Sequence, residues 1–283
     1  MTKYSRVESL VVSLRKSKRQ GKDSLPAAKR RALVREFGID AVRALLIAEH
    51  PKWEAEVFEL GAEGSPWPYA GLSAREVATR ALGPLADRLP RTIGKLASAE
   101  LVVVAHHVPE SDSPDLGGWF LIYALPEEHG PELWIAGAPE PAPELAIDGW
   151  DLPAPLRELY AQHHGLGVLC DEFGWTGVDP GIQPTPQLSI PSLPELDGDE
   201  DAPDPTDLLR FTRGTGEAGE SGWCIVRNRK LRKGRSKPGD LAICELDDQF
   251  GLLGNPVPFD FWGFLDRYLV GDPNGELPTA EHY

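Results

Sequence analysis

The chain has 283 residues and a mass of 31.0 kDa, with 41% hydrophobic and 26% charged residues. This globular composition excludes wholesale disorder, and the length allows one large or two ordinary domains with a core that needs no disulfide or metal. No apolar run approaches the roughly 18 residues of a membrane-spanning helix. The apolar stretch from Leu10 to Leu14 is too short for a signal peptide.

The net charge of −15 is unevenly distributed. Residues 1–37 contain eleven basic and three acidic residues, a net charge of +8, so the rest of the chain carries −23. Such an acidic body repels nucleic acid and attracts basic proteins. The three cysteines, Cys170, Cys224 and Cys244, form no CxxC pair. Their sparse, odd number argues against a disulfide scaffold or a zinc site and favours a cytoplasmic location.

Helical patterns dominate the first hundred residues. Residues 1–25 are rich in lysine and arginine, and we expect a short helix or a basic arm there. Helical signals begin at Pro26 and stop at Gly38, and we expect Asp40 to cap a second helix through Ala48. A loop is expected from there to residue 72.

The clearest helix start lies at Ser73. Ser73 and Glu76 have the spacing of a capping box and predict a helix over 73–82, and helical spacing continues over 85–96 despite two prolines. Short apolar runs at 101–104, 119–123 and 133–135 then predict a three-strand antiparallel meander.

A proline-rich connector at 139–145 predicts a domain boundary. Beyond it we expect an amphipathic helix that begins near Leu152 and ends at Gly165, followed by a loop to Pro194. The remaining predicted elements are strands at 208–213, 222–228 and 240–246 and a closing helix from Asp260 to Gly271.

Motifs that carry chemistry are weak. The GxGxxG stretch at 214–219 is followed by a strand pattern rather than a helix, which favours a hairpin loop over a phosphate site. The pairs His106-His107 and His163-His164 cannot each chelate one ion, because neighbouring side chains diverge on a strand or helix. We expect no metal, no cofactor and no catalytic group.

Acidic loops are the candidate partner-binding residues. The stretch 195–207 contains no basic residue and reads either as a solvated loop or as a docking surface for a basic partner. Two acidic doublets and one tryptophan extend this set. The predicted partner-binding residues are Asp171, Glu172, Trp175, Glu195, Asp197, Asp199, Glu200, Asp201, Asp204, Asp207, Asp247 and Asp248.

A basic run at 227–237 lies between two predicted strands. No aromatic residue interleaves it, so base stacking is unsupported, and pairing with an acidic surface is the favoured interpretation. Nucleic-acid contact is expected only through the basic N-terminal arm, and no contact with a membrane is expected.

Three segments of the second half resemble the SMI1/KNR4 family, also called the SUKH superfamily. The stretch Leu152–Gly165 resembles the family's opening helix, with His164-Gly165 where Asn-Gly is usual. The strand–turn–strand at 208–226, followed by Gly239–Cys244, resembles its middle, and Phe259–Leu269 resembles its closing helix. The resemblance covers about residues 148–271, roughly half of the chain.

The resemblance implies an α+β domain with a mixed sheet and flanking helices. Many bacterial members are immunity proteins that block toxins, often nucleases, and others are scaffolding domains; none is implied to be an enzyme. The whole chain is therefore expected to be α+β, divided into a basic arm (1–25), a helical and meander domain (26–145), a SUKH-like domain (146–271) and a tail (272–283).

We expect a non-catalytic, cytoplasmic protein-binding module that blocks a basic, toxin-like protein. The alternatives are a structural or assembly component, and an enzyme with a cleft between the two halves.

Overall fold

The chain divides into two compact units that both combine helices with antiparallel strands, which confirms the mixed α+β class. The first unit comprises Met1–Ala86, Ile93–Ala138 and Leu166–Trp175, and the second comprises Asp87–Thr92, Pro139–Gly165 and Thr176–Tyr283. The domain bounds expected from the sequence stay a prediction. The computed structural model describes residues 7–12, 14, 27–49, 55–107, 118–127, 130–139, 154–163, 165–170, 174–184, 208–213, 222–226, 241–246 and 252–270.

The first unit begins with helices, as predicted. Helices α2 (Ala27–Phe37) and α3 (Ile39–Glu49) are separated by Gly38, whose φ of +54° ends the first helix. The prediction for Asp40 was wrong, because this residue lies inside the first turn of α3 rather than before it. Its carboxylate instead accepts a hydrogen bond of 3.0 Å from the Arg43 guanidinium.

Residues 7–12 form a short helix, one of the two forms expected for the N-terminal stretch. Leu10, Val11 and Leu14 are buried in the same apolar cluster as Val34 and Val42. The basic composition had hidden this apolar side, since the leucines and valines are too few to set a long period. The described part of the N-terminal stretch therefore belongs to the core.

The sheet of the first unit contains the predicted meander and extends it at both ends. The central strands are β2 (Leu101–His107), β3 (Gly118–Glu127) and β4 (Gly130–Gly137). Strand β1 (Ala55–Phe58) pairs with β2, and β5 (Leu166–Cys170) pairs with β4, all antiparallel. The loops predicted at these two places were wrong, because each strand is too short to show a periodicity by itself.

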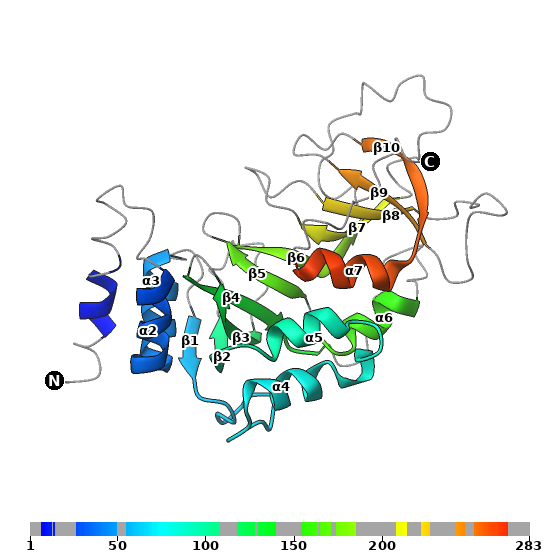
Figure 1. Cartoon of the computed structure of the whole chain (residues 1–283). Helices are drawn as coiled ribbons and strands as arrows, with labels where there is room; N and C mark the ends of the chain where they lie inside the picture. Colours follow the sequence, from blue (N-terminus) through cyan, green and yellow to red (C-terminus); the bar gives the residue numbers. More distant parts are fainter. Residues whose placement is uncertain are drawn as a thin grey trace. The chain divides into compact units, whose positions relative to one another are not determined.

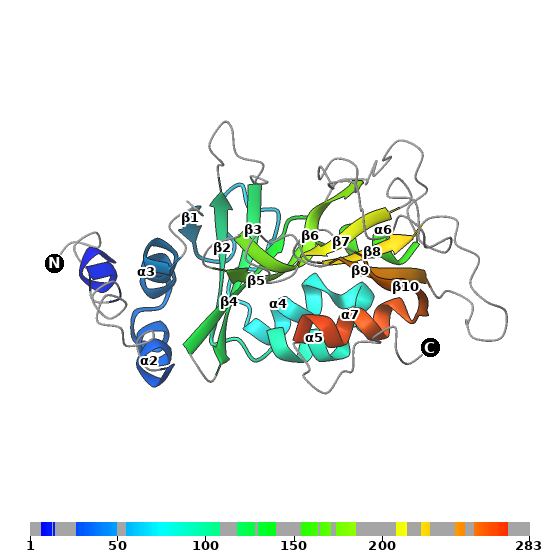
Figure 2. The ribbon, with the colours of Figure 1, turned by 90° about the horizontal axis from the view of Figure 1, so that it is seen from above.

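Both faces of this sheet are buried, which explains the unbroken apolar runs. On one face, Val57, Val103, Ile122 and Ile135 belong to the cluster formed with α2 and α3. The opposite face carries Val104, Leu121, Tyr123 and Trp134, which are also buried, and α4 (Ala74–Ala81) packs against β2. Figures 1 and 2 show α2 and α3 on one side of β1–β4 and α4 on the other.

The outer edge of this sheet is covered by an arginine. Strand β1 pairs on one side with β2, and the Arg43 Nε of α3 donates to the Val57 carbonyl at 3.2 Å. A second nitrogen of the same guanidinium, Nη2, donates to the same oxygen. Asp40 fixes the guanidinium through its own ion pair. Covering an edge carbonyl in this way removes one acceptor that another strand could use.

The predicted capping box at the start of α4 is confirmed. The Glu76 backbone N–H donates to the Ser73 hydroxyl at 3.4 Å, and the Ser73 N–H donates to the Glu76 carboxylate at 2.8 Å. The Ser73 hydroxyl also donates to the Glu76 carboxylate at 2.6 Å. This hydrogen bond, together with the one from the Ser73 backbone N–H, lowers the pKa of Glu76 below its usual value. The next helical pattern is divided at its prolines into a short 3₁₀ helix, η1 (Gly83–Leu85), and helix α5 (Pro90–Leu96).

The second unit contains the predicted hairpin and closing helix. Strands β7 (Leu208–Arg213), β8 (Gly222–Val226) and β9 (Leu241–Leu246) pair antiparallel, so the GxGxxG stretch joins two hairpin strands as predicted. Strand β6 (Gly174–Pro184) was predicted as a loop, which was wrong, and β10 (Leu252–Phe259) lies where no element was predicted. Both contain glycine and proline and a register shift, features that conceal a strand pattern. The flanking helices of this unit are α6 (Ala154–Tyr160) and α7 (Phe261–Val270).

Helix α7 packs against β7 through aromatic rings. The Phe211 ring lies 5.5 Å from that of Phe261 and 6.4 Å from that of Phe264. Asp260 caps the helix, as predicted, by accepting a hydrogen bond of 3.2 Å from the Gly263 N–H. The face of α7 that carries Phe261 and Phe264 is thus the face turned toward the strands.

Asp266 of α7 caps the first turn of α5. Its buried carboxylate accepts hydrogen bonds from the backbone N–H groups of Arg91 (3.1 Å) and Thr92 (2.8 Å) and from the Thr92 hydroxyl (2.9 Å). The first turn of a helix leaves such N–H groups without intrahelical partners. The Asp266 side chain, which is distant in sequence, therefore accepts the hydrogen bonds that a local N-cap residue accepts in other helices.

The Asp266 cap yields the first prediction. Asp266→Ala should lower the free energy of unfolding by about 2–4 kcal/mol, because it leaves buried donors without an acceptor. Asp266→Asn keeps one oxygen acceptor and should lose clearly less. Urea denaturation of both variants measures the difference, and equal losses would show that the hydrogen bonds to α5 contribute nothing specific.

Candidate functional site

The acidic residues predicted to bind a partner lie outside the described residues. These are Asp171, Glu172, Glu195, Asp197, Asp199, Glu200, Asp201, Asp204, Asp207, Asp247 and Asp248. Trp175 lies in β6, but its side chain is not among the described ones. Trp262 of α7 is only 9% exposed and packs edge-on against Phe261.

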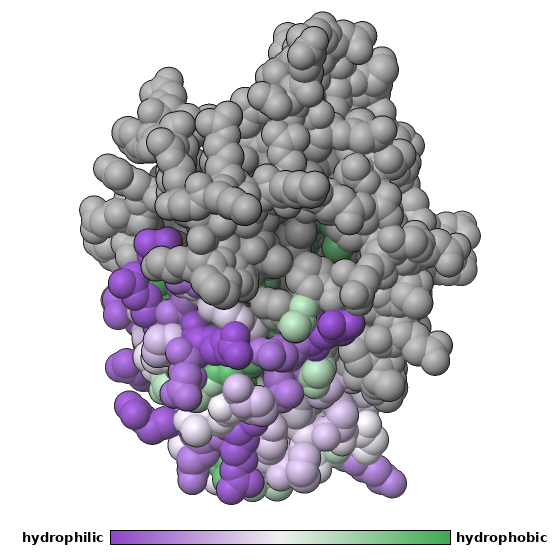
Figure 3. Space-filling model, turned by 90° about the vertical axis from the view of Figure 1, so that its right-hand side faces the viewer, coloured by the Kyte–Doolittle hydropathy of each residue, from purple (hydrophilic) through white to green (hydrophobic). Residues whose placement is uncertain are grey.

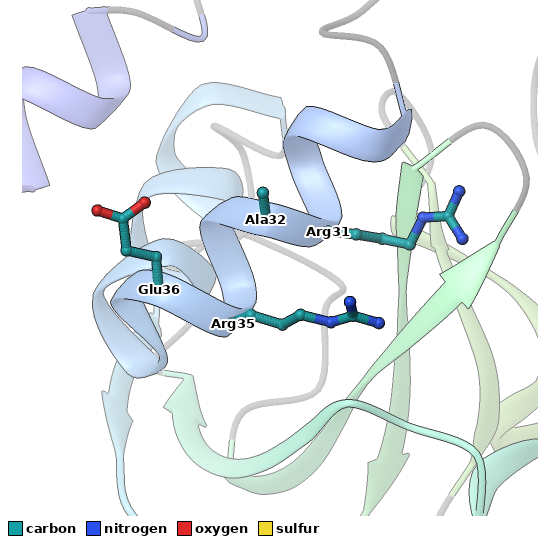
Figure 4. A pocket seen from close by; sticks show the side chains of 4 residues that line it. All are labelled: Arg31, Ala32, Arg35 and Glu36. Atoms are coloured by element: carbon teal, nitrogen blue, oxygen red, sulfur yellow. The ribbon is translucent and has the colours of Figure 1, made fainter.

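An open hollow of about 440 Å³ lies along α2 and is lined by Arg31, Ala32, Arg35 and Glu36 (Figure 4). Figure 4 shows the two arginines extending to one side of the helix and Glu36 to the other. The Arg35 Nε donates to the Glu100 carboxylate at 3.0 Å, so its charge is already paired within the chain. A site that binds a small molecule usually encloses most of its surface, and this shallow hollow does not.

Tyr123 carries a buried hydroxyl in the middle of the sheet. It is fully buried, and its Oη has no hydrogen-bond partner among the described residues. Burial raises the pKa of Tyr123 above its usual value, and the neighbouring Tyr69 raises it further. The phenol therefore stays protonated at neutral pH and is unsuited to act as a base or a nucleophile.

The histidine pair of β2 is split between the two faces of the sheet. His107 is buried, whereas the ring of His106 lies half-exposed, 4.9 Å from that of Trp119. Within the described ranges, no group of three histidine, cysteine or acidic side chains lies close enough to hold a metal ion.

A half-exposed aromatic group occupies one end of the sheet, on the face that α4 covers elsewhere. The strand register aligns Glu56, His106 and Trp119 in one row across β1, β2 and β3. Phe58 lies on the same face of β1, with its ring 5.8 Å from that of Trp119. We call Glu56, Phe58, His106 and Trp119 the Trp119 cluster. Glu56 is exposed and the three rings are half-buried.

The loop from β1 to α4 borders this cluster. Backbone hydrogen bonds close its turns, including Ser65 N–H to the Ala62 carbonyl at 3.1 Å. Trp67 is buried and anchors the loop, while Gly64 lies close beneath Trp119. In this loop Glu59 follows Phe58 and Glu63 precedes Gly64 in the sequence, and both glutamates are exposed.

Two other tryptophans already contact a cation that is paired with a carboxylate. In the first unit the Lys95 ammonium lies 4.9 Å from the centre of the Trp134 ring and 3.3 Å from the Glu132 carboxylate. In the second unit the Arg88 guanidinium lies 5.2 Å from the centre of the Trp262 ring and 3.6 Å from Glu158. Both are cation–π contacts of ordinary length.

The sequence interpretation missed the Trp119 cluster. It weighed His106 only as a metal ligand and treated Trp119 as part of an apolar run. One signal was present in the sequence: from Glu54 to Ala74 the chain has four glutamates and no lysine or arginine. What the sequence could not show is the register that aligns residues from three strands.

Most of the described surface in Figure 3 is hydrophilic. No helix in the described part of the chain is both long and apolar enough to cross a bilayer. Comparison with known proteins found no family model, no curated protein and no solved structure that matches this chain.

The loop that borders the cluster gives a prediction about glycine. Gly61 and Gly71 both have a positive φ, but a Cβ on Gly61 would meet the Ala70 Cβ at 2.5 Å, whereas one on Gly71 would meet nothing within 4 Å. Gly71→Ala should therefore cost about 1 kcal/mol of backbone strain, and Gly61→Ala about 2–4 kcal/mol. Thermal unfolding of the two variants tests this, and equal costs would contradict the close packing of the loop.

Tyr123 gives a prediction about pH. Because its hydroxyl is buried without a partner, Tyr123→Phe should leave the free energy of unfolding unchanged or raise it by up to about 1 kcal/mol. The raised pKa contributes stability below about pH 10, where the unfolded phenol is also protonated, and this stability is lost as the pH rises further. Tyr123→Phe should thus lose less stability than the wild type in urea denaturation at alkaline pH. A phenylalanine variant that is less stable at neutral pH would show that the hydroxyl has a partner.

Proposed function

We propose that this chain is a non-catalytic protein-binding module that acts in the cytoplasm and blocks a basic protein. The observation that supports this most is the charge of −23 carried by the residues after position 37. A large negative field speeds the encounter with a basic partner and disfavours acidic ones.

The resemblance to the SUKH superfamily supports an immunity-type role. The second unit has, in order, the short helix α6, the hairpin β7–β8, strand β9 and the closing helix α7. This is the order in which the resembling segments follow each other. A toxin such as a nuclease, whose surface is basic in order to bind nucleic acid, is the partner that this charge would suit.

The described N-terminal residues favour this proposal over an assembly role for a free basic arm. Leu10, Val11 and Leu14 are buried among the residues of the first unit's core. Residues that contribute to a core are not available to dock elsewhere.

The proposal predicts a salt-dependent interaction. The tagged full-length chain, incubated with extract from its native cell, should retain a protein of high isoelectric point that is released as the salt concentration rises. With that protein purified, a variant with the seven acids of 195–207 changed to Asn or Gln should associate about tenfold more slowly at low salt and equally fast at high salt.

Surface plasmon resonance measures the association rates, and the seven substitutions leave the rest of the chain unchanged. Retention of acidic or salt-insensitive proteins alone would overturn the proposal. An association rate that does not change in the variant would overturn the role of the 195–207 acids.

A further inference from the structure

We propose that the Trp119 cluster, defined above as Glu56, Phe58, His106 and Trp119, binds an arginine side chain of the basic partner. This inference rests on the proposed function and assigns a place on the surface where one partner residue is held. Its chemistry is a guanidinium placed against aromatic rings and paired with a carboxylate.

The geometry of the cluster suits a flat cation. The Trp119 ring is half-exposed and is tilted by 54° from His106 and by 48° from Phe58, so the three rings form an uneven wall rather than a closed stack. Glu56 lies at the other end of the row, beyond His106. Neighbouring strands are about 4.8 Å apart, so the row spans about 10 Å from Trp119 to Glu56. A long arginine side chain can contact the rings with its apolar stem or guanidinium plane and still reach the carboxylate.

The chain itself shows which group is missing from the cluster. Trp134 has Lys95 and Glu132, and Trp262 has Arg88 and Glu158, each as aromatic ring, cation and carboxylate. Trp119 has a carboxylate in its row, but none of the described lysines and arginines lies over its ring. The cluster thus has two parts of an arrangement that is complete at two other places, and among the described residues it lacks the cation.

The charge around the cluster selects a cation over other ligands. Glu56, Glu59 and Glu63 are exposed within and beside it, and the described residues 55–74 contain no lysine or arginine. An anionic or purely apolar side chain would have to approach these carboxylates without compensation. Arginine is favoured over lysine because its planar guanidinium stacks on rings and pairs with carboxylates at lower desolvation cost.

The position of the cluster keeps it accessible. Along the same face, Val104 and Leu121 are buried, whereas Phe58, His106 and Trp119 are half-buried and Glu56 is exposed. Among the described residues of this face, the aromatic side chains that reach solvent are therefore those of the cluster. A half-exposed tryptophan beside other aromatic rings is typical of residues that dominate a binding interface.

The test uses a fluorescein-labelled hexa-arginine peptide and the intact chain, with hexa-lysine and hexa-glutamate peptides for comparison. Fluorescence anisotropy at low salt should show binding of hexa-arginine, weaker binding of hexa-lysine and no binding of hexa-glutamate. Trp119→Leu should weaken the hexa-arginine Kd about fivefold, because it keeps an apolar side chain and removes the ring face. Glu56→Gln should weaken it about threefold at low salt.

Glu36→Gln is the matched control. It makes the same change of charge on α2, which covers the opposite face of the sheet, and Glu36 is likewise exposed. This variant should bind hexa-arginine within about 1.5-fold of the wild type, since it changes only the overall charge. Equal weakening by Glu36→Gln and Glu56→Gln would overturn the inference, as would absence of hexa-arginine binding.

The same variants separate this inference from the proposed function. If the purified basic partner binds the wild type and the Trp119→Leu and Glu56→Gln variants equally, the inference fails and the proposed function stands. If Trp119→Leu does not fold, the exposed Glu56→Gln and the ring-removing Phe58→Leu decide the outcome against Glu36→Gln. Unchanged hexa-arginine binding in both would then overturn the inference.

Discussion

The first unit depends on one constraint: its antiparallel sheet is buried on both faces. Helices α2 and α3 and the short N-terminal helix cover one face, and α4 packs on the other. Side chains pointing either way from β2, β3 and β4 must then be apolar, which is unusual for an antiparallel sheet. Tyr123 is the exception in the middle, where a buried hydroxyl finds no partner among the described residues.

The same constraint decides where polar chemistry can occur. A sheet covered on both sides reaches solvent only at its edge and at the ends of its strands. At the edge, the Arg43 guanidinium, held by Asp40, donates to the Val57 carbonyl. At the strand ends of the face on which α4 packs, Phe58, His106 and Trp119 are half-exposed, and glutamates lie near them in the sequence. The Trp119 cluster thus combines exposed acidic side chains with aromatic ones.

Local patterns predicted the local structure well. The capping box of Ser73, the turn at Gly38, the meander and the closing helix from Asp260 could be predicted, because a few neighbouring residues determine each of them. Strands β1, β5, β6 and β10 could not, since they are short or interrupted by glycine and proline and are formed by pairing with neighbours. The Trp119 cluster depends on register between three strands, and the Asp266 cap joins residues 174 positions apart. Neither leaves a periodic signal.

The bonds between Asp266 and the start of α5 also bear on how the chain is made. During translation, Arg91 and Thr92 leave the ribosome long before Asp266, which lies 174 residues beyond Thr92, has been synthesised. Translation adds about 5–20 residues per second, so the first turn of α5 stays without its cap for roughly ten seconds or more. During that interval the nascent chain can complete the β1–β4 meander, whose contacts are close in sequence, but not the second unit, which includes Asp87–Thr92. The cap on the first turn of α5 can therefore form only after α7 has been synthesised, later than the local contacts of the meander.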